Sequence, residues 1–320
     1  MPKLNKSTTS LTTLPMSDDF LLYLQTNNYS PETVYNYERD VKTFENFLNE
    51  SKIKFSKLDK KSIINYKAYL SSIDRGTAQN VKGHTRLGSY SINRILSSLR
   101  TYFKYLIEMD YQSPLSPDSI KLVKTERKHP KVAEFNEIVK LIESPIKLEK
   151  NTKVGLRNRA MLEVLFATGM RISELINLKK SQINETGKIF IMGKGKKERF
   201  VYLTPRSIKH LRNYLYDFSS SSDYLFVPLR GLNAGDKNKK ISPNYLQERI
   251  KYYRELLQIN IPISAHSLRH AFATYLAEEG ANPAAIQILL GHESLDTTTR
   301  YVHASDRYAQ EVHHKFHPLA

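Results

Sequence analysis

The chain of 320 residues contains no cysteine. This absence excludes disulfide bonds, thiol nucleophiles and cysteine-ligated metal ions, and it fits a reducing compartment. The sequence also lacks any apolar run that approaches the roughly 18 residues of a membrane-spanning helix. Residues 1–19 have no apolar segment of the kind that forms the core of a signal peptide. We therefore expect a soluble, cytoplasmic protein.

Acidic residues are scarce relative to basic ones. There are 32 Asp and Glu residues against 49 Lys and Arg, which gives a net charge of +17. Residues 1–130 carry +7 of this charge and residues 131–320 carry +10, so the surplus is not confined to a tail. Such a balance indicates a polyanionic partner, although charge that only keeps a protein soluble and monomeric is an alternative interpretation.

The length and composition of the chain predict two domains, because a single core rarely grows beyond about 250–300 residues. Residues 1–16 are polar and predict a flexible arm, and residues 17–111 predict a helical domain. Residues 112–131 combine prolines with a charge run and predict a linker. Residues 132–320 then form the second domain.

Apolar periodicity predicts helices around residues 20–24 and at 30–50, 59–73 and 89–109, which together form a small four-helix domain. Ser30 is the expected N-cap of the second helix and Pro31 its first residue. The polar loop 74–88 is basic, and it is either an ordinary surface loop or one that contacts phosphates. The candidate DNA-binding residues in this domain are Lys82, Arg86 and Arg94.

The second domain mixes helices with one short pair of strands. Helical patterns at 134–143 and 156–168 end at Gly169, and a short helix containing Glu174 follows. The β-prone runs 188–192 and 199–203 predict a hairpin. Further helices are expected at 206–217, 243–257, 267–279, 283–290 and in the tail. The fold class is therefore mainly α with a small β-hairpin.

Tyr301 is a candidate nucleophile, but a phenol with a pKa of about 10 reacts at neutral pH only if its proton is removed or its anion is stabilised. Attack on a phosphodiester also builds negative charge, which fixed cationic donors stabilise. Arg171 follows a helix-ending glycine and has Glu174 three residues later to orient a guanidinium. An ordinary surface arginine is the plain alternative.

Two further stretches supply groups that such a site needs. His266 and Arg269 lie on one face of a helix N-terminus, where the helix dipole favours an anion. Lys194 lies at the tip of the predicted hairpin, and its titratable ammonium suits proton donation to a leaving oxygen. Lys196 and Lys197 share that loop, and a solvated basic turn is the alternative interpretation.

Four motifs occur in a fixed order in the C-terminal half: ATGMRISEL (167–175), GKGKKERFVYL (193–203), HSLRHAFAT (266–274) and LLGHESLDTTTRYVH (289–303). Together with the helical N-terminal half, they resemble the tyrosine recombinase (phage integrase) family, most closely its Xer branch. The resemblance spans most of the chain and fills six family positions, which are Arg171, Lys194, His266, Arg269, His292 and Tyr301.

The resemblance implies a role for each of these residues. Two arginines, Arg171 and Arg269, would clamp the scissile phosphate, and Tyr301 would attack it to form a 3′-phosphotyrosyl bond. The other three would act on protons and on the phosphate: Lys194 would protonate the departing 5′ oxygen, His266 would assist proton transfer, and His292 would hydrogen-bond the phosphate. This chemistry requires no cofactor, metal ion or ATP.

The resemblance also implies an architecture and partners. A helical core-binding domain and a mixed catalytic domain would form a C-shaped clamp around double-stranded DNA that carries a short inverted-repeat core site. Residues 304–320 would form a helix that docks into a neighbouring protomer. The assembly would be a homotetramer on two sites, or a heterotetramer with a second recombinase, and an accessory DNA translocase is a possible further partner. The three histidines His313, His314 and His317 are expected to be solvated rather than to bind metal.

Several alternatives remain open. The same chemistry serves Xer-type chromosome dimer resolution, integration of a mobile element or DNA relaxation by a type IB topoisomerase. A basic DNA-binding protein without catalysis needs only the charged surface. His266 and His270 have the spacing of a zinc pair, but Ser267 stands where a catalytic glutamate is expected and Arg269 would repel a cation. The segment GKGKKE lacks the pattern of a P-loop.

Overall fold

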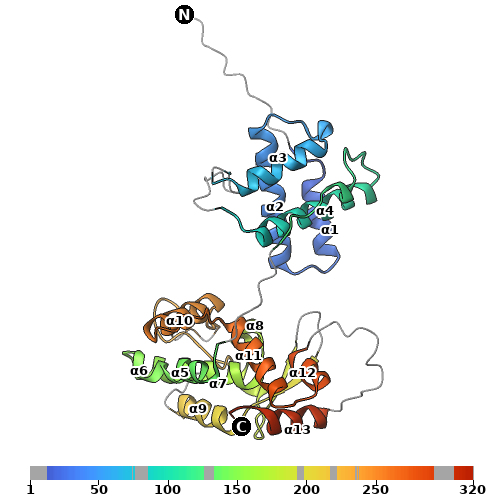
Figure 1. The fold of residues 1–320 in the computed structure, drawn as a ribbon. Helices are drawn as coiled ribbons and strands as arrows, with labels where there is room; N and C mark the ends of the chain where they lie inside the picture. Colours follow the sequence, from blue (N-terminus) through green and yellow to red (C-terminus); the bar gives the residue numbers. More distant parts are fainter. Residues whose placement is uncertain are drawn as a thin grey trace, which may run out of the picture. The chain divides into compact units, whose positions relative to one another are not determined.

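The computed structural model describes residues 13–73, 75, 86–125, 133–192, 198–216, 222–234, 236, 238–291 and 306–319. The chain divides into two compact units, residues 1–129 and residues 130–320. Figure 1 shows helices α1–α4 gathered in the first unit and helices α5–α13 in the second. Each unit has its own hydrophobic core. The second unit contains all the motifs that predict chemistry.

The described residues of the first unit form four α-helices and two short 3-10 helices. They are α1 (Ser17–Thr26), α2 (Pro31–Glu50), η1 (Phe55–Lys57), α3 (Lys60–Ser71), α4 (Ser89–Glu108) and η2 (Pro117–Ser119). The Ser30 hydroxyl accepts a hydrogen bond from the Thr33 N–H, which confirms the predicted cap of α2. The α2 and α4 helices pack on each other and on α1 and α3 through their apolar faces. The four predicted helices are thus confirmed.

A buried carboxylate connects α2 to α4 in this unit. Asp40 is 4 % exposed and accepts hydrogen bonds from both terminal nitrogens of Arg94, at 2.5 and 2.8 Å. The Ser98 hydroxyl donates a third bond at 2.7 Å. Burial raises the pKa of Asp40, although the bonds from Ser98 and Arg94 oppose this rise. This network fixes the register of the two longest helices of the unit.

Part of the segment that the sequence assigns to the linker packs on the first unit. Ile120 is fully buried and Leu115 is 9 % exposed in the core of that unit. The Asn93 side chain forms two hydrogen bonds with the backbone of Val123, at 2.9 and 2.8 Å. Residues 112–125 therefore cover α4.

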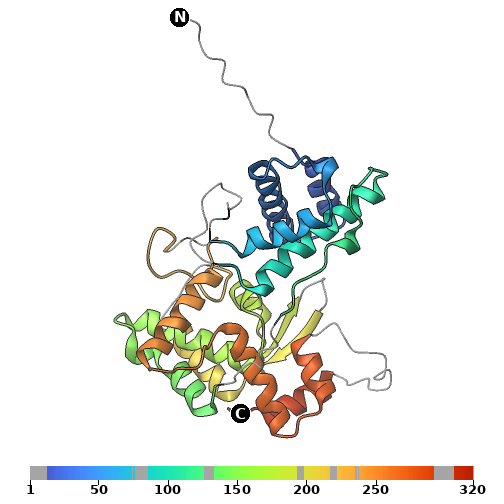
Figure 2. The same cartoon turned by 45° about the horizontal axis from the view of Figure 1, so that its top comes forward.

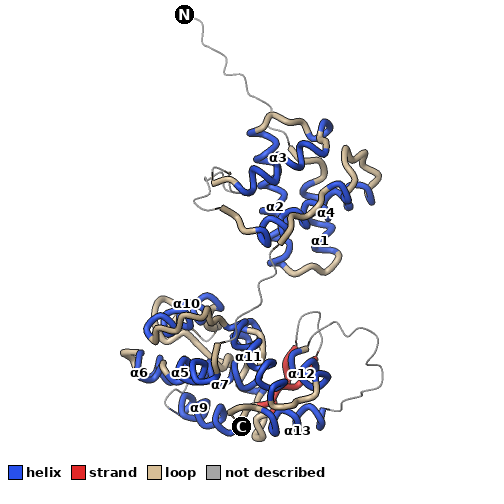
Figure 3. Tube along the Cα trace, in the orientation of Figure 1, coloured by secondary structure: helices blue, strands red, loops and turns tan. Residues whose placement is uncertain are grey.

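The second unit contains nine α-helices, one 3-10 helix and two strands among its described residues. They are α5 (Phe135–Glu143), α6 (Pro145–Leu148), α7 (Thr152–Thr168), α8 (Ile172–Asn177), η3 (Lys180–Gln182), β1 (Lys188–Met192), β2 (Glu198–Tyr202), α9 (Pro205–Tyr216), α10 (Pro243–Leu256), α11 (Ala265–Glu278), α12 (Pro283–Leu290) and α13 (Asp306–Phe316). The predicted mainly helical class is confirmed, as Figure 3 shows.

Helix α7 is the central element of the second unit. Its side chains are buried on every face from Arg157 to Thr168, and it contacts α5, α6, α8, α9, α11 and β2. A helix covered on all sides shows little amphipathic pattern, and tertiary packing rather than local propensity holds it. Its C-terminal residue, Thr168, is fully buried, and the turn to α8 starts there.

The two strands form the predicted antiparallel hairpin. Met192 pairs with Glu198 and Ile191 pairs with Arg199, so the strands separate at the loop 193–197. Figure 2 shows the strands beside the helices at the C-terminal end of the chain, and β2 contacts both α12 and α13. Strand β2 thus lies on the side of the unit that carries α12 and α13.

Candidate active site

The turn from α7 to α8 fixes the position of Arg171. Gly169 ends α7 in the left-handed conformation with φ of 60°, as the sequence predicts. A Cβ atom at this position would lie 2.4 Å from the Phe272 ring, so the turn requires glycine for both backbone and space. The backbone N–H of Arg171 donates to Glu174 Oε2 at 2.7 Å. Arg171 therefore starts α8 with its side chain about one-third exposed.

Glu174 is a buried carboxylate between two arginines. Its Oε1 accepts from Arg171 Nη1 at 3.1 Å, and both of its oxygens accept from the Arg199 guanidinium at 2.9 and 2.8 Å. Burial favours the neutral acid, but the hydrogen bonds and charge of Arg199, joined by those of Arg171, hold the pKa of Glu174 below its ordinary value. The carboxylate is therefore charged at neutral pH and orients both guanidinium groups.

Arg269 lies on α11 and joins the ends of two other helices. It is only 6 % exposed, and its guanidinium donates to the Gly169 carbonyl at 2.8 Å and to the Leu290 carbonyl at 2.6 Å. Burial and the neighbouring charges of Arg171 and Arg199 lower the pKa of Arg269 to about 10. It remains a cation at neutral pH, within a site that concentrates positive charge.

Three arginines from different elements meet the C-terminal end of α12. The last carbonyls of a helix lack partners within the helix. Here the Leu289 carbonyl accepts from Arg199 at 2.9 Å, and the Gly291 carbonyl accepts from Arg171 at 3.3 Å. With the bond from Arg269 to Leu290, these contacts fix the end of α12 to α8, α11 and β2. The next residue in the sequence is His292, and Tyr301 follows nine positions later.

His266 and His270 lie on exposed positions of α11, near its N-terminus. Their Nε2 atoms are 3.0 Å apart, so one ring donates to the other. Partial burial and the proximity of His270 and of the Arg269 guanidinium lower the pKa of His266, which favours a neutral imidazole that can accept a proton. Within the described ranges, no group of three or more His, Cys, Asp or Glu side chains is placed to hold a metal ion.

The remaining predicted residues fall into two groups. Lys194, His292, Tyr301 and Lys82 lie outside the described residues. Arg86 is exposed, and the Arg94 side chain is 52 % exposed while it pairs with Asp40. The carboxylate offsets much of the Arg94 charge, so Arg94 offers less to a phosphate than a free arginine does.

Sequence reasoning missed Arg199, although the sequence contains a signal for it. Residues of a strand alternate between its two faces. Arg199 is therefore in phase with Val201, which is fully buried, and the structure buries Arg199 to 8 % exposure. A charged residue on the inward face of a short strand requires a partner, and here that partner is Glu174.

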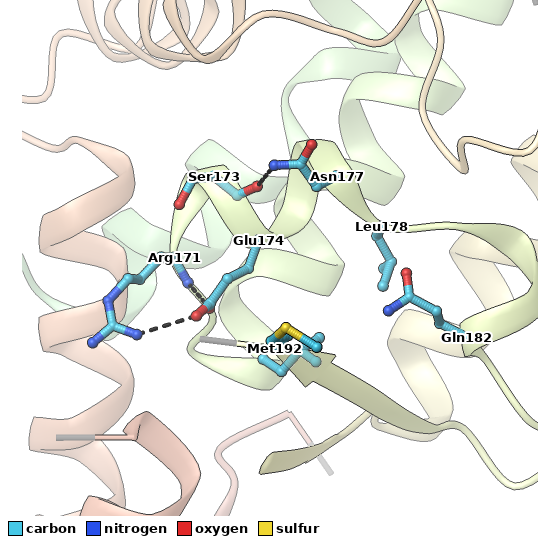
Figure 4. Close-up of a pocket in the computed structure, with 8 residues that line it drawn as sticks. Arg171, Ser173, Glu174, Asn177, Leu178, Gln182 and Met192 are labelled. Atoms are coloured by element: carbon cyan, nitrogen blue, oxygen red, sulfur yellow. Dashed lines mark hydrogen bonds and ion pairs between the residues drawn. The ribbon is translucent and has the colours of Figure 1, made fainter. Parts of the chain in front are cut away.

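A pocket of about 460 Å³ opens beside Arg171, between α8 and the end of β1. Ser173, Glu174 and Asn177 contribute from α8, and Met192 contributes from the end of β1 (Figure 4). The side chain of Arg171 points to one side of this pocket while it contacts Glu174 (Figure 4). Met192 is the last residue of β1, and Lys194 follows it two positions later in the sequence.

Helix α13 packs on its own unit, against α12 and β2. His313 is fully buried and His317 is 5 % exposed, so the expectation that these tail histidines are solvated is wrong. The physical reason is that both rings cap α7: Nε2 of His313 contacts the Ala167 carbonyl at 2.5 Å, and Nε2 of His317 contacts the Phe166 carbonyl at 3.3 Å. His314, by contrast, is exposed as expected.

Both buried rings are neutral in this packing. Burial lowers the pKa of His313 to about 4 and the pKa of His317 to about 3, and the charges of His314 and, at His317, Arg206 add to this effect. Each Nε2 donates to a carbonyl, so Nδ1 carries no proton. Nδ1 of His313 is buried without a hydrogen-bond partner among the described residues. A second proton on that ring would therefore have no acceptor.

We predict that acidification releases α13. The pKa values of both histidines are lower in the packed state than their ordinary value of about 6.5, so the packing is fully stable above pH 6.5 and weakens as the pH falls below it. At pH 5 the expected loss is roughly 2 kcal/mol for each ring. Hydrogen exchange of residues 310–319 should increase strongly between pH 7.5 and pH 5, after correction for the intrinsic exchange rate.

The matched variants are His313→Phe and His314→Phe. Phenylalanine at the buried position cannot titrate, so the first variant should lose about half of the pH dependence of exchange in α13, and His317 accounts for the rest. The second variant changes an exposed ring and should behave like the wild type. An equal pH response of all three proteins would contradict this assignment.

Comparison with known proteins identifies the family of this chain. Residues 131–307 match the model of the phage integrase family, and residues 18–109 match the model of the phage integrase N-terminal SAM-like domain. The chain belongs to the phage integrase family.

Among its relatives, the tyrosine recombinase XerD of Staphylococcus epidermidis is 32% identical over 314 residues, which cover 95% of this chain and 98% of the relative. The tyrosine recombinase XerC of Staphylococcus aureus is 32% identical over 313 residues, which cover 95% of this chain and 97% of that protein. The predicted class of enzyme is therefore confirmed, and the chain is a site-specific tyrosine recombinase.

Solved structures show the same fold. A XerH site-specific recombinase bound to a palindromic difH substrate aligns with a TM-score of 0.66 and 22% identity, over 92% of this chain and 83% of that one. A lambda integrase fragment bound to a core site aligns with a TM-score of 0.66 and 17% identity, over 87% of this chain and 94% of that one. In the part of the chain that the structure describes, no helix is long and apolar enough to cross a membrane.

Proposed function

We propose that this recombinase cuts and rejoins DNA at one short site through Tyr301, with Arg171 and Arg269 as the groups that bind the scissile phosphate. One observation carries this assignment: both arginines donate to the C-terminal end of α12, Arg171 to the Gly291 carbonyl and Arg269 to the Leu290 carbonyl, and His292 is the next residue in the sequence. The chain after α12 therefore starts at the cationic site and leads to Tyr301. A dense positive site of this kind suits an anionic phosphodiester.

The proposed reaction is a transesterification. The Tyr301 oxygen attacks the phosphorus, the bond from phosphorus to the 5′ oxygen breaks, and the 3′ phosphate becomes attached to the tyrosine. Lys194 gives a proton to the leaving 5′ oxygen, and neutral His266 accepts the proton of the phenol. His292 donates a hydrogen bond to a non-bridging oxygen. A 5′ hydroxyl from the partner duplex then attacks the phosphotyrosyl bond and releases the enzyme.

Two features support the proton roles of Lys194 and His266. The lowered pKa of His266 keeps its ring neutral at neutral pH, as a base requires. The hairpin anchors the loop of Lys194 through the pair Met192 and Glu198, and Met192 lines the same pocket as Arg171. Lys194 follows Met192 by two positions in the sequence, which supports its assignment as the acid.

We expect Lys194→Ala to slow strand cleavage by about 10²–10⁴-fold, the usual contribution of a general acid. A substrate in which sulfur replaces the 5′ oxygen should restore most of the rate, because a thiolate leaves without a proton. The measurement is the rate of covalent adduct formation on both substrates. Lys196→Ala and Lys197→Ala are the matched controls in the same loop, and rescue of one of these variants instead would move the acid to that residue.

The partner is double-stranded DNA with a short inverted-repeat site, and we place the protein in the cytoplasm with the chromosome. The homologues named XerD and XerC favour an Xer-type role, in which recombination resolves chromosome dimers before cell division. Four protomers would act on two sites, either as a homotetramer or together with a second recombinase, and an accessory DNA translocase would control the reaction. In that assembly α13 would leave its own unit and dock on a neighbour.

Sequencing of DNA ends that become covalently attached to the protein in its native cell tests this role. An Xer-type role predicts one recurrent chromosomal site with inverted-repeat arms. Ends that map to the borders of a mobile element would support an integrase instead. Wild-type protein treated with nuclease before capture controls for unattached DNA.

A further inference from the structure

We propose that Arg199 is a positioning residue for strand cleavage, which holds the hairpin of Lys194, the guanidinium of Arg171 and the end of α12 in one arrangement. This inference rests on the proposed function of the site. Arg199 is almost completely shielded from solvent, because its side chain is only 7 % exposed. It therefore acts through other residues rather than on the phosphate.

The contacts of Arg199 use three nitrogens of its guanidinium. Two of them form a fork with the Glu174 carboxylate, at 2.9 and 2.8 Å. The third, Nε, donates to the Leu289 carbonyl at 2.9 Å. A planar guanidinium is suited to such a fork, whereas an ammonium group presents one point charge. Arg199 thus links β2 to α8 and to α12 at once.

The position of Arg199 on the hairpin explains what it holds. Its strand partner is Ile191, and the next pair, Met192 and Glu198, is the last before the loop of Lys194. The start of β2 is therefore fixed to α12 by the side chain of its second residue. Gly291, with φ of 64°, completes the fit: an added Cβ there would lie 3.0 Å from the Cδ atom of Arg199.

Arg199 also sets the charge that Arg171 presents. Glu174 contacts both arginines, and Arg269 lies close enough that the charges of Arg171 and Arg199 lower its pKa. Three guanidinium groups and one carboxylate give a net charge of +2 at this site. Without Arg199, the carboxylate of Glu174 would be balanced by Arg171 alone. The guanidinium of Arg171 would then turn toward Glu174 and away from the phosphate.

The first test compares four proteins at a DNA site that wild-type protein cleaves. Arg199→Met should lower the single-turnover rate of adduct formation by about 100-fold, with the DNA dissociation constant within about threefold of wild type. Arg199→Lys keeps the charge but loses the forked pair of hydrogen bonds to Glu174, and its rate of adduct formation should be about tenfold below that of wild type. The double variant Arg199→Met/Glu174→Gln has no uncompensated carboxylate. It should therefore form the adduct about tenfold faster than Arg199→Met.

The matched control is Arg159→Met, which breaks another buried pair in the same unit, between Arg159 and Glu163 at 2.6 Å. It should lower the melting temperature at least as much as Arg199→Met while the cleavage rate stays near wild type. If Arg199→Met and Arg159→Met lose the same melting temperature and also the same cleavage rate, the role of Arg199 is only structural. A wild-type rate in folded Arg199→Met would overturn the proposal outright.

A second readout needs no cleavage, so it separates this proposal from the proposed function. Hydrogen exchange in the absence of DNA should be faster in Arg199→Met than in wild type for the α12 peptide 286–291 and the α8 peptide 172–177, and unchanged in α10. If wild-type protein forms no adduct, the proposed function fails. The exchange measurement still tests whether Arg199 holds α8 and α12 in place. Unchanged exchange in both peptides would overturn its positioning role.

Discussion

Replacement of Tyr301 by phenylalanine is expected to abolish the covalent protein–DNA adduct, with a loss of at least about 10³-fold in cleavage rate. Phenylalanine keeps the ring but lacks the oxygen that forms the bond to phosphorus. DNA affinity should stay within about threefold of wild type, because phosphate contacts from basic residues dominate such affinity. The measurement pairs an adduct assay under denaturing conditions with DNA binding under native ones.

Tyr216 provides a matched control for this variant. It is a fully solvent-exposed tyrosine at the end of α9, and Tyr216→Phe should cleave at the wild-type rate. Cleavage by Tyr301→Phe at a rate close to wild type would remove Tyr301 from the reaction. Loss of binding together with cleavage would instead indicate that the variant disrupts the DNA surface.

Replacement of Arg269 by alanine should affect both cleavage and stability. The change removes a cation from the site, and loss of one such donor typically costs about 10²–10³-fold in rate. It also leaves the carbonyls of Gly169 and Leu290 without the donor that now pairs with them, at a cost of about 3 kcal/mol in the free energy of unfolding. Cleavage rates and denaturant unfolding measured on the same protein separate the two effects.

Arg157→Ala is the control that separates the loss of stability in Arg269→Ala from its loss of cleavage rate. Arg157 is 2 % exposed and donates to the Val227 carbonyl at 2.9 Å, but it lies near the other end of α7, roughly 18 Å from Gly169 along the helix axis. Arg157→Ala should destabilise the protein to a similar degree and keep most of the cleavage activity below its melting temperature. If the two variants lose activity equally, Arg269 has no role beyond folding.

The sequence predicts the helices because each surface helix repeats its apolar residues with one periodicity. Ser30 and Pro31 mark the start of α2, and Gly169 marks the end of α7, because their backbone preferences are local. The short hairpin follows from two β-prone runs around a Gly and Lys loop. These features depend on neighbours in the chain, so the sequence alone contains them.

The contacts that the sequence does not reveal depend on residues far apart in the chain. Arg199 and Glu174 are 25 positions apart, and Arg269 reaches Gly169 across 100 positions. No local pattern around His313 predicts its burial. His313 is buried because α13 covers the end of α7, where its contact Ala167 lies 146 positions earlier. The motif residues Arg171, His266 and Arg269 are found from the resemblance, but the arrangement that holds them requires the three-dimensional structure.

The most direct test of the central claim is to identify the residue that carries the DNA after denaturation. Wild-type protein is trapped with its DNA site, digested with trypsin and nuclease, and the modified peptide is sequenced by mass spectrometry. The proposed reaction predicts a phosphotyrosyl bond at Tyr301 to the 3′ end of the cut strand. A covalent bond at another residue, attachment to a 5′ end, or DNA binding without any adduct would contradict it.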